Sequence, residues 1–479
     1  MSESPRPSAS GVDPALAATA RAARFVAALD AATIPADVAE KARCCILYGF
    51  GIGMLCLDQD TARVAERAAR ALDGAPGPRG ATALVSGERA SVSAAACANA
   101  VLLHSRCQED TSGTAHLGVV TLSVALALIE AGLADGVDFL PAIVAGYEVG
   151  GTLEAALGRD SMKGGHRASA IYGAVAAAAT AARLLRLAPA QIDAALANAL
   201  GFAGGTLQSI PEGSDEWRYQ VGTAVRNGLF AASLAQQGSV SARAAIEGPQ
   251  GFALSFARRP VDPGALTFGA PWRILDVTFK PYPVCAHNQP VALVGAQVHA
   301  RVPAANIRAL TLRLNPYVVP GMLERGPFTR VPETLMSSAF CCATACLTGS
   351  VSMASLSAFD DPAVKSLMDR IAIELDDAVP FPSAVAEIET RDGEKIVLRE
   401  QRRFCDYSLD RPAVVAQLQR LAAEEGISTN AVHVLERFAF GPVAGDAALV
   451  AQAYAAARER RAGGDRQPSR PVPPLQGSR

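Results

Sequence analysis

Polar residues concentrate in one short segment between two very apolar stretches of the chain. The segment reads His104-Ser-Arg-Cys107-Gln-Glu109-Asp110-Thr111-Ser-Gly-Thr-Ala-His116. Imidazoles, carboxylates and hydroxyls together can transfer protons and hold anionic groups, and loops often carry such chemistry. The alternative interpretation is a solvated surface turn.

Two more polar runs precede expected helices. His166 follows two glycines, and at a helix start the free N–H groups and the helix dipole favour a neutral imidazole that can act as a base. An ordinary helix cap is the alternative there. Trp217 and Arg218 come just before an Ala-rich segment and could equally belong to a salt-bridged loop.

A fourth run places a lysine among prolines, in Phe279-Lys280-Pro-Tyr282-Pro-Val-Cys-Ala-His287. The prolines restrict the backbone around Lys280 and Tyr282. A lysine on a stiff loop can hold a substrate carboxylate or an enolate oxygen. A boundary loop between domains is the alternative.

The elements that must position these runs are predicted to be mainly helices. Half of the 479 residues are hydrophobic, and Ala-rich segments recur. Alanine favours helix and lets helix axes approach closely. The expected helical segments are 91–103, 119–131, 171–187, 189–201 and 222–237, with Thr33 as the N-cap of an earlier helix.

The pattern changes after about residue 265. Residues 307–314 alternate apolar and polar side chains, which predicts a half-buried strand. Residues 384–389 and 395–399 flank the turn Arg391-Asp-Gly-Glu394, a hairpin signal, and 371–375 are a further candidate strand.

We therefore predict a mainly α fold with a large all-helical domain and a smaller α+β lid domain. The helical domain is expected over 14–265 and again over 401–461, and the α+β domain over 266–400. Residues 1–13 and 462–479, rich in Ser, Pro and Gly, are predicted to be disordered tails.

Composition argues against several classes of function. The net charge of −2 gives no electrostatic reason to expect nucleic acid or an anionic membrane as a partner. No phosphate-binding glycine loop is convincing.

The ten cysteines lie mostly in apolar segments, as buried thiols of a reducing compartment do. The N-terminus lacks an apolar signal core, and the apolar run 118–131 is too short to cross a bilayer. We expect a cytoplasmic protein without a metal or other cofactor.

Taken in order, these motifs resemble the MmgE/PrpD family over about residues 14–460. The matching elements are Asn99, His104, Glu109-Asp110-Thr111, His116, Gly146-Tyr147-Glu148, Gly164-Gly165-His166, Tyr172-Gly173-Ala174, the helix from Gly222 to Leu229, Glu247-Gly248, Gly251-Phe252 and the run Lys280–His287. The lysine run and the Gly-Tyr-Glu element are the most specific.

The resemblance implies a homodimer with a site in the cleft between the two domains. Family members include 2-methylcitrate dehydratases, cis-aconitate decarboxylases and iminodisuccinate epimerases, which act without a metal on small di- or tricarboxylates. Such chemistry needs cations for the carboxylates, a base for an acidic C–H proton and an acid for the leaving group. The candidate catalytic residues are Lys280, His166, His116 and Asp110. The candidate substrate-binding residues are Thr111, Arg218, His104, Cys107, Tyr282, His287 and Tyr317.

Two departures from the family pattern affect the expected reaction. Cys107 stands where many members have the first Asp of an Asp-Phe-Asp-Asp-Thr run, and the spacing from Thr111 to His116 is one residue short. A thiol carries no comparable negative charge unless its pKa is lowered. We expect a lyase that dehydrates a small hydroxy-polycarboxylate. The alternatives are an epimerase or other isomerase, a decarboxylase, and a non-catalytic helical dimer.

Overall fold

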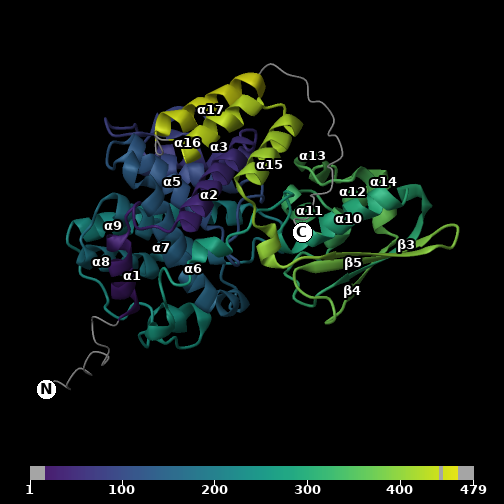
Figure 1. Cartoon of the computed structure of the whole chain (residues 1–479), viewed down its shortest axis with the longest axis horizontal. Helices are drawn as coiled ribbons and strands as arrows, with labels where there is room; N and C mark the ends of the chain where they lie inside the picture. The colour runs from purple at the N-terminus through teal and green to yellow at the C-terminus, as the bar shows by residue number, and fades with distance from the viewer. Residues whose placement is uncertain (1–16, 442–445, 462–479) are drawn as a thin grey trace.

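The computed structural model describes residues 17–441 and 446–461, and Figure 1 shows a helical body beside a smaller sheet-containing one. The two predicted tails, 1–13 and 462–479, lie outside the described residues. The fold is mainly helical, as the Ala-rich composition predicted. A small sheet is confined to the later part of the chain, apart from one short hairpin.

The helical body packs around α7, which contacts α5, α6, α8 and α9. The helices come from both ends of the chain, because α15, α16 and α17 return to pack beside α2 (Figure 1). The elements are α1 (Ala18–Ala28), α2 (Ala36–Met54), α3 (Asp60–Asp73), α4 (Val92–His104), α5 (Leu117–Glu130), α6 (Phe139–Lys163), α7 (Ala168–Leu184), α8 (Pro189–Phe202), α9 (Glu216–Gln236), α15 (Arg411–Glu424), α16 (Thr429–Phe440) and α17 (Ala447–Arg461).

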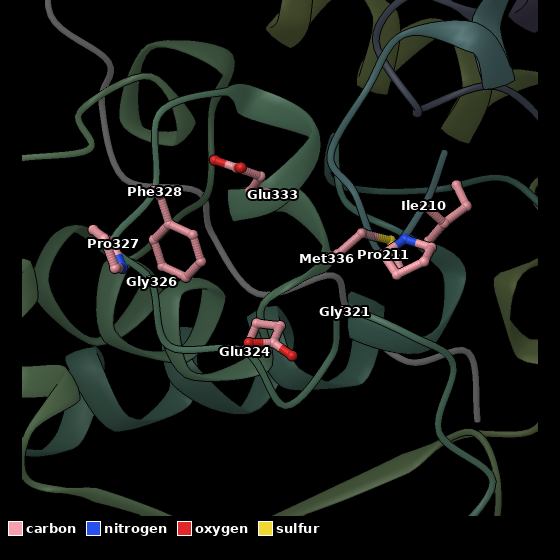
Figure 2. Close-up of a pocket in the computed structure, with 9 residues that line it drawn as sticks. All are labelled: Ile210, Pro211, Gly321, Glu324, Gly326, Pro327, Phe328, Glu333 and Met336. Atoms are coloured by element: carbon pink, nitrogen blue, oxygen red, sulfur yellow. The ribbon is translucent and has the colours of Figure 1, made fainter. Parts of the chain in front are cut away.

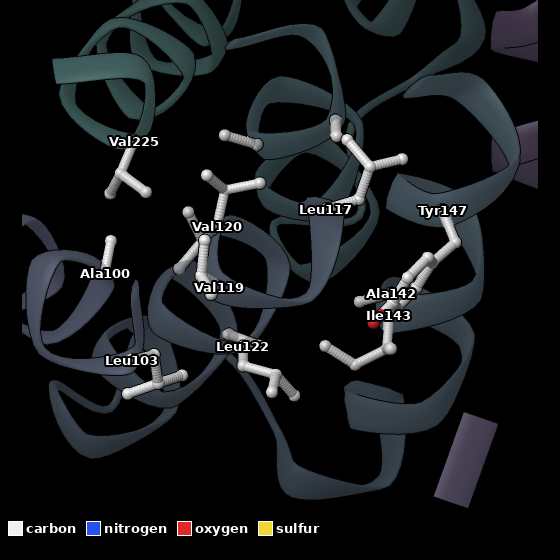
Figure 3. Packing of buried hydrophobic residues seen from close by; sticks show 14 of the residues in the cluster. Ala100, Leu103, Leu117, Val119, Val120, Leu122, Ala142, Ile143, Tyr147 and Val225 are labelled. Atoms are coloured by element: carbon white, nitrogen blue, oxygen red, sulfur yellow. The ribbon is translucent and has the colours of Figure 1, made fainter. Parts of the chain in front are cut away.

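Small residues let these helices approach one another. A Cβ atom added at Gly49 of α2 would collide with Leu122 of α5, and one added at Gly146 of α6 would collide with Thr121. Figure 3 shows the core where α4, α5 and α6 meet, with Leu103, Leu122 and their neighbours fully buried. This dense packing fixes both ends of the polar segment between α4 and α5.

The second body is a four-stranded sheet with helices on one face. The strand order is β4-β3-β5-β6, with β3 parallel to β4 and antiparallel to β5, and with β5 and β6 forming the predicted hairpin. Helix α10 packs on β5 and β6, and α12 on β4 (Figure 1). The elements are α10 (Gln289–Arg301), β3 (Ile307–Leu314), α11 (Val331–Met336), α12 (Ser338–Thr348), α13 (Met353–Leu356), α14 (Pro362–Met368), β4 (Ile371–Leu375), β5 (Ser383–Thr390) and β6 (Lys395–Gln401).

Three local expectations were wrong. The helical body is not entirely helical, because β1 (Ala81–Ala83) and β2 (Glu88–Ala90) form a hairpin that the Asn99 side chain ties to α4. Pro35, not Thr33, is the N-cap of α2, because Thr33 instead bonds back to Asp30 in a turn. Helix α9 begins at Glu216, so its first turn already includes the polar residues expected before it.

The two bodies have separate hydrophobic cores. Phe279 still packs in the helical core, whereas Tyr282 packs with the residues of the sheet-containing body. Lys280 therefore lies where the chain passes from one core to the other. Among the described helices, none is both long and apolar enough to cross a membrane.

Candidate active site

The polar segment between α4 and α5 is buried, so the alternative of a solvated surface turn is wrong. Glu109 and His104 have no exposed surface, and Asp110 and Thr111 are at most 3% exposed. Burying so many polar groups is costly unless they are paired. The segment must therefore be held by specific partners.

Those partners come from distant parts of the chain. The backbone of Thr111 pairs with that of Thr278 through two hydrogen bonds, of 2.9 and 3.0 Å. The Tyr48 hydroxyl of α2 lies 2.8 Å from the Gln108 carbonyl and 2.7 Å from the Lys280 carbonyl. Gln417 of α15 also donates to the Lys280 carbonyl, at 2.9 Å. These bonds hold the segment against the lysine run.

Glu109 is the common neighbour of three nitrogen-bearing side chains. Its Oε1 accepts a hydrogen bond from Lys280 Nζ at 3.1 Å. The same oxygen lies 3.2 Å from His104 Nδ1 and 3.3 Å from His116 Nδ1. One buried carboxylate thus positions the lysine and two histidines together.

The charges in this cluster stabilise one another. Burial would raise the pKa of Glu109, but Lys280, His104 and His116 outweigh it and hold that pKa well below its usual range. Burial would lower the pKa of Lys280, but the neighbouring Cys107 and Glu109 raise it. Burial raises the pKa of Cys107 itself, so its thiol stays neutral. The carboxylate of Glu109 and the ammonium of Lys280 are therefore both charged at neutral pH.

Both histidines of the segment are neutral. Burial lowers the pKa of His104 to about 4, and burial together with Lys280 lowers that of His116 further below its usual value. His116 Nδ1 lies 2.9 Å from the Asp110 carbonyl and faces Glu109, which are both acceptors. This places the proton on Nδ1 and leaves Nε2 with a free lone pair that can accept a proton.

Arg167, the N-cap of α7, brings a second cation to the cluster. Its guanidinium lies 2.6 Å from His104 Nε2 and donates to the Trp217 carbonyl at 2.8 Å. Burial lowers its pKa to about 10, which still leaves it charged. The cluster thus combines two cations, Lys280 and Arg167, with the carboxylates of Glu109 and Asp110, and burial raises the pKa of Asp110 to about 6.

A cavity of about 1020 Å³ opens beside the cluster, between the helical body and the sheet-containing body. Of the predicted site residues, six line it: Cys107, Thr111, His116, Lys280, His287 and Tyr317. Two of them carry buried polar atoms that have no hydrogen-bond partner among the described residues, namely Thr111 Oγ1 and His287 Nε2. Unpaired buried polar atoms in residues that line a cavity are common in ligand-binding sites.

Cys107 has a constrained backbone at the base of this cavity. Its φ of 54° is in the left-handed region, and its carbonyl accepts a hydrogen bond from Lys280 Nζ at 3.0 Å. Its sulfur lies 3.9 Å from the same ammonium. The turn at Cys107 therefore supplies a backbone oxygen, rather than a side-chain charge, to the lysine.

Five predicted site residues are not among those that line the cavity. Asp110 and His104 lie behind it, Asp110 bonded to the Tyr147 hydroxyl. Arg218 donates to the Ser105 carbonyl and Asp215, and Tyr282 is buried in the second core. The His166 ring packs against Phe256, with 4.8 Å between ring centroids.

Two residues that the sequence analysis did not select are central to the cluster. Glu109 stood next to Asp110 in the polar segment, and nothing in its spacing favoured one carboxylate over the other. Arg167 directly follows His166, and only its contact with His104 distinguishes it from a surface arginine. Among the described residues, no three His, Cys, Asp or Glu side chains are grouped so that they could hold a metal ion.

Comparison with known proteins agrees with this architecture. The MmgE/PrpD N-terminal domain matches residues 20–262 and the MmgE/PrpD C-terminal domain matches residues 282–422. The chain therefore belongs to the MmgE/PrpD family. The cis-aconitate decarboxylase-like protein oryM of Aspergillus oryzae is 28% identical over 413 residues, covering 79% of this chain and 84% of the relative. Cis-aconitate decarboxylase of Aspergillus terreus is 28% identical over 271 residues, covering 53% and 54%.

Proposed function

We propose that the protein is a cofactor-independent lyase that acts on a small di- or tricarboxylate at the cavity beside Lys280. The observation that carries the proposal is the arrangement of Lys280 and His116 around Glu109 at the cavity wall. It puts a charged ammonium next to a neutral imidazole whose Nε2 can accept a proton. The family membership and the names of the relatives support the same class of reaction.

Two buried cations, Lys280 and Arg167, line the cavity, and cations there suit a negatively charged substrate. Thr111 Oγ1 is available to donate a hydrogen bond to a carboxylate. Preorganised donors and cations of this kind stabilise the charge that develops when a proton leaves a carbon next to a carboxylate.

In the dehydration that we propose, His116 Nε2 takes the proton from this carbon. Lys280 stabilises the resulting enolate-like carboxylate, the neighbouring C–O bond breaks, and the hydroxyl leaves as water after receiving a proton. Tyr317 is the proposed proton donor, because it lines the cavity and a phenol carries its proton at neutral pH. The products are an unsaturated polycarboxylate and water.

Decarboxylation is the second candidate, and the names of the relatives favour it. Here a carboxylate of an unsaturated substrate leaves as carbon dioxide, and the electron pair left on carbon takes up a proton. The same cation would stabilise the intermediate, and Tyr317 would again supply the proton.

An assay of the purified protein with two substrate panels tests both candidates. Hydroxy-di- and tricarboxylates that gain enoate absorbance identify a dehydratase, and unsaturated tricarboxylates that release carbon dioxide identify a decarboxylase. Exchange of solvent deuterium into a substrate without loss of water or carbon dioxide would instead identify an epimerase. Lys280→Met must abolish the activity while circular dichroism shows that the variant is folded. An activity that survives in Lys280→Met, or no reaction with either panel, contradicts the proposal.

A further inference from the structure

The cavity is larger than a small polycarboxylate requires. At about 1020 Å³ it reaches the upper end of the range of roughly 300–1,000 Å³ that is typical of sites for drug-sized ligands. The groups that can recognise carboxylates include the polar loop after α4 and the cations Arg167, Lys280 and Lys163. Most of the other residues that line the cavity are apolar.

This remaining wall is apolar and comes largely from the sheet-containing body. Its members include Leu207, Ile210, Val318, Val319, Leu335 and Met336, which we call the apolar wall. Leu275 and Phe404 also line the cavity, and they remain 38% and 41% exposed. Large hydrophobic side chains that line a cavity are suited to an apolar group that removes their surface from water.

The apolar wall is continuous with the base of the polar region. Cys107, Cys285, Leu335 and Met336 belong to one buried cluster, and the Cys285 amide donates to the Leu335 carbonyl. Next to Met336 lies a second, smaller cavity, which shares Ile210, Pro211 and Met336 with the first and is also lined by Glu324 and Glu333. Figure 2 shows Ile210, Pro211 and Met336 together on one side of this smaller cavity.

From this continuity we infer that the substrate carries an aliphatic chain of several carbons on its polycarboxylate skeleton. The carboxylates bind at Lys280 and Thr111, and the chain lies along the apolar wall towards Met336. The inference rests on the proposed function and narrows its substrate class. The neutral thiol of Cys107, which belongs to the apolar cluster, fits a chain that begins close to the lysine.

A series of substrates tests the chain directly. Affinity is measured by calorimetry for hydroxytricarboxylates that carry no substituent, a methyl, a propyl or a pentyl chain. Each fully buried methylene contributes about 0.8 kcal/mol, so affinity should rise about fourfold per added carbon. Equal affinity across the series would overturn the chain subsite but leave the proposed function intact. If no member of the series binds, the chain subsite fails, and the two substrate panels decide the proposed function separately.

Substitution of the apolar wall gives an independent readout. Val318 is half-buried on a loop, so Val318→Asn is expected to preserve folding. The increase in affinity from the methyl to the pentyl compound should be at least fivefold smaller in this variant. Val240 is 99% exposed and does not line the cavity, so Val240→Asn is the control. This variant should show the same increase in affinity with chain length as the unaltered protein. If the increase in affinity is unchanged in Val318→Asn, the aliphatic chain does not lie along the apolar wall.

Discussion

Lys280 Nζ lies 3.1 Å from Glu109 Oε1, and neither side chain is more than 3% exposed. The two residues are 171 positions apart in the sequence, yet they form an ion pair directly behind the cavity that Lys280 lines. A buried ion pair of this kind must be complete, because removal of one partner leaves the other charge unpaired in a medium that solvates it poorly.

Glu109→Gln is therefore expected to destabilise the protein by roughly 3–5 kcal/mol and to abolish turnover. The amide cannot balance the ammonium of Lys280 or orient His116. Urea unfolding measures the stability. The matched control is Asp360→Asn, whose carboxylate pairs with Lys365 on the surface and is 93% exposed, and it should cost less than about 1 kcal/mol. An equal loss of unfolding free energy in the two variants would show that Glu109 does not hold the cluster together.

Arg167→Lys is expected to weaken polycarboxylate binding by roughly ten- to a hundredfold. Two different guanidinium nitrogens contact His104 and the Trp217 carbonyl. The single ammonium nitrogen of a lysine cannot make both contacts in this geometry. Loss of one charge-assisted hydrogen bond is worth about 1.5–3 kcal/mol. Calorimetric titration measures the affinity, and the exposed Arg399 on β6 provides the control Arg399→Lys. If both variants bind like the unaltered protein, Arg167 has no role in recognition.

Gly113→Ala should disrupt the polar segment. The φ of Gly113 is +60°, and an added Cβ would collide with the Glu154 carboxylate, which accepts hydrogen bonds from Thr114. Gly393, in the β5–β6 turn, has φ +89° and no atom within 4 Å of an added Cβ. Gly393→Ala should therefore cost only the backbone strain of about 1 kcal/mol, and Gly113→Ala clearly more. Thermal unfolding of both variants decides the comparison, and a similar loss in each would mean that the segment tolerates displacement.

His287 should contribute to acid sensitivity. Burial and Lys280 lower its pKa to about 4, whereas an unfolded histidine titrates near 6.5. Between these values the unfolded state binds the extra proton, so stability is lost as the pH falls below 6.5. The loss from this group amounts to roughly 2–3 kcal/mol at pH 4.5.

His287→Gln should remove this part of the acid sensitivity. Unfolding free energies are measured at pH 7.5 and pH 4.5 for both proteins. The difference between the two pH values should shrink in the variant, whatever the contributions of other titrating groups. An identical difference in the two proteins would show that His287 is not held neutral by its surroundings.

The sequence predicted the helices and strands well where one local signal dominated. Alternation predicted β3, and the Asp392-Gly393 turn predicted the β5–β6 hairpin. Alanine content predicted α4, α5 and α7 to within a few residues. The prediction failed at β1–β2, where three-residue strands are tied to α4 by hydrogen bonds of the Asn99 side chain, a tertiary contact.

For the site, residue types identified the polar segment and Lys280 as belonging to the same chemistry, and the family motifs placed them in order. Tertiary structure decided which residues act together. Tyr48 and Gln417 hold the Lys280 run against the buried polar segment. Glu109, and not Asp110, forms the ion pair with Lys280, and Arg167 joins the cluster through His104. Spacing along a chain cannot specify these choices, because they depend on helices from both ends of the sequence packing around one loop. Only that packing brings the charged neighbours together, and these neighbours keep Glu109 and Lys280 charged despite their burial.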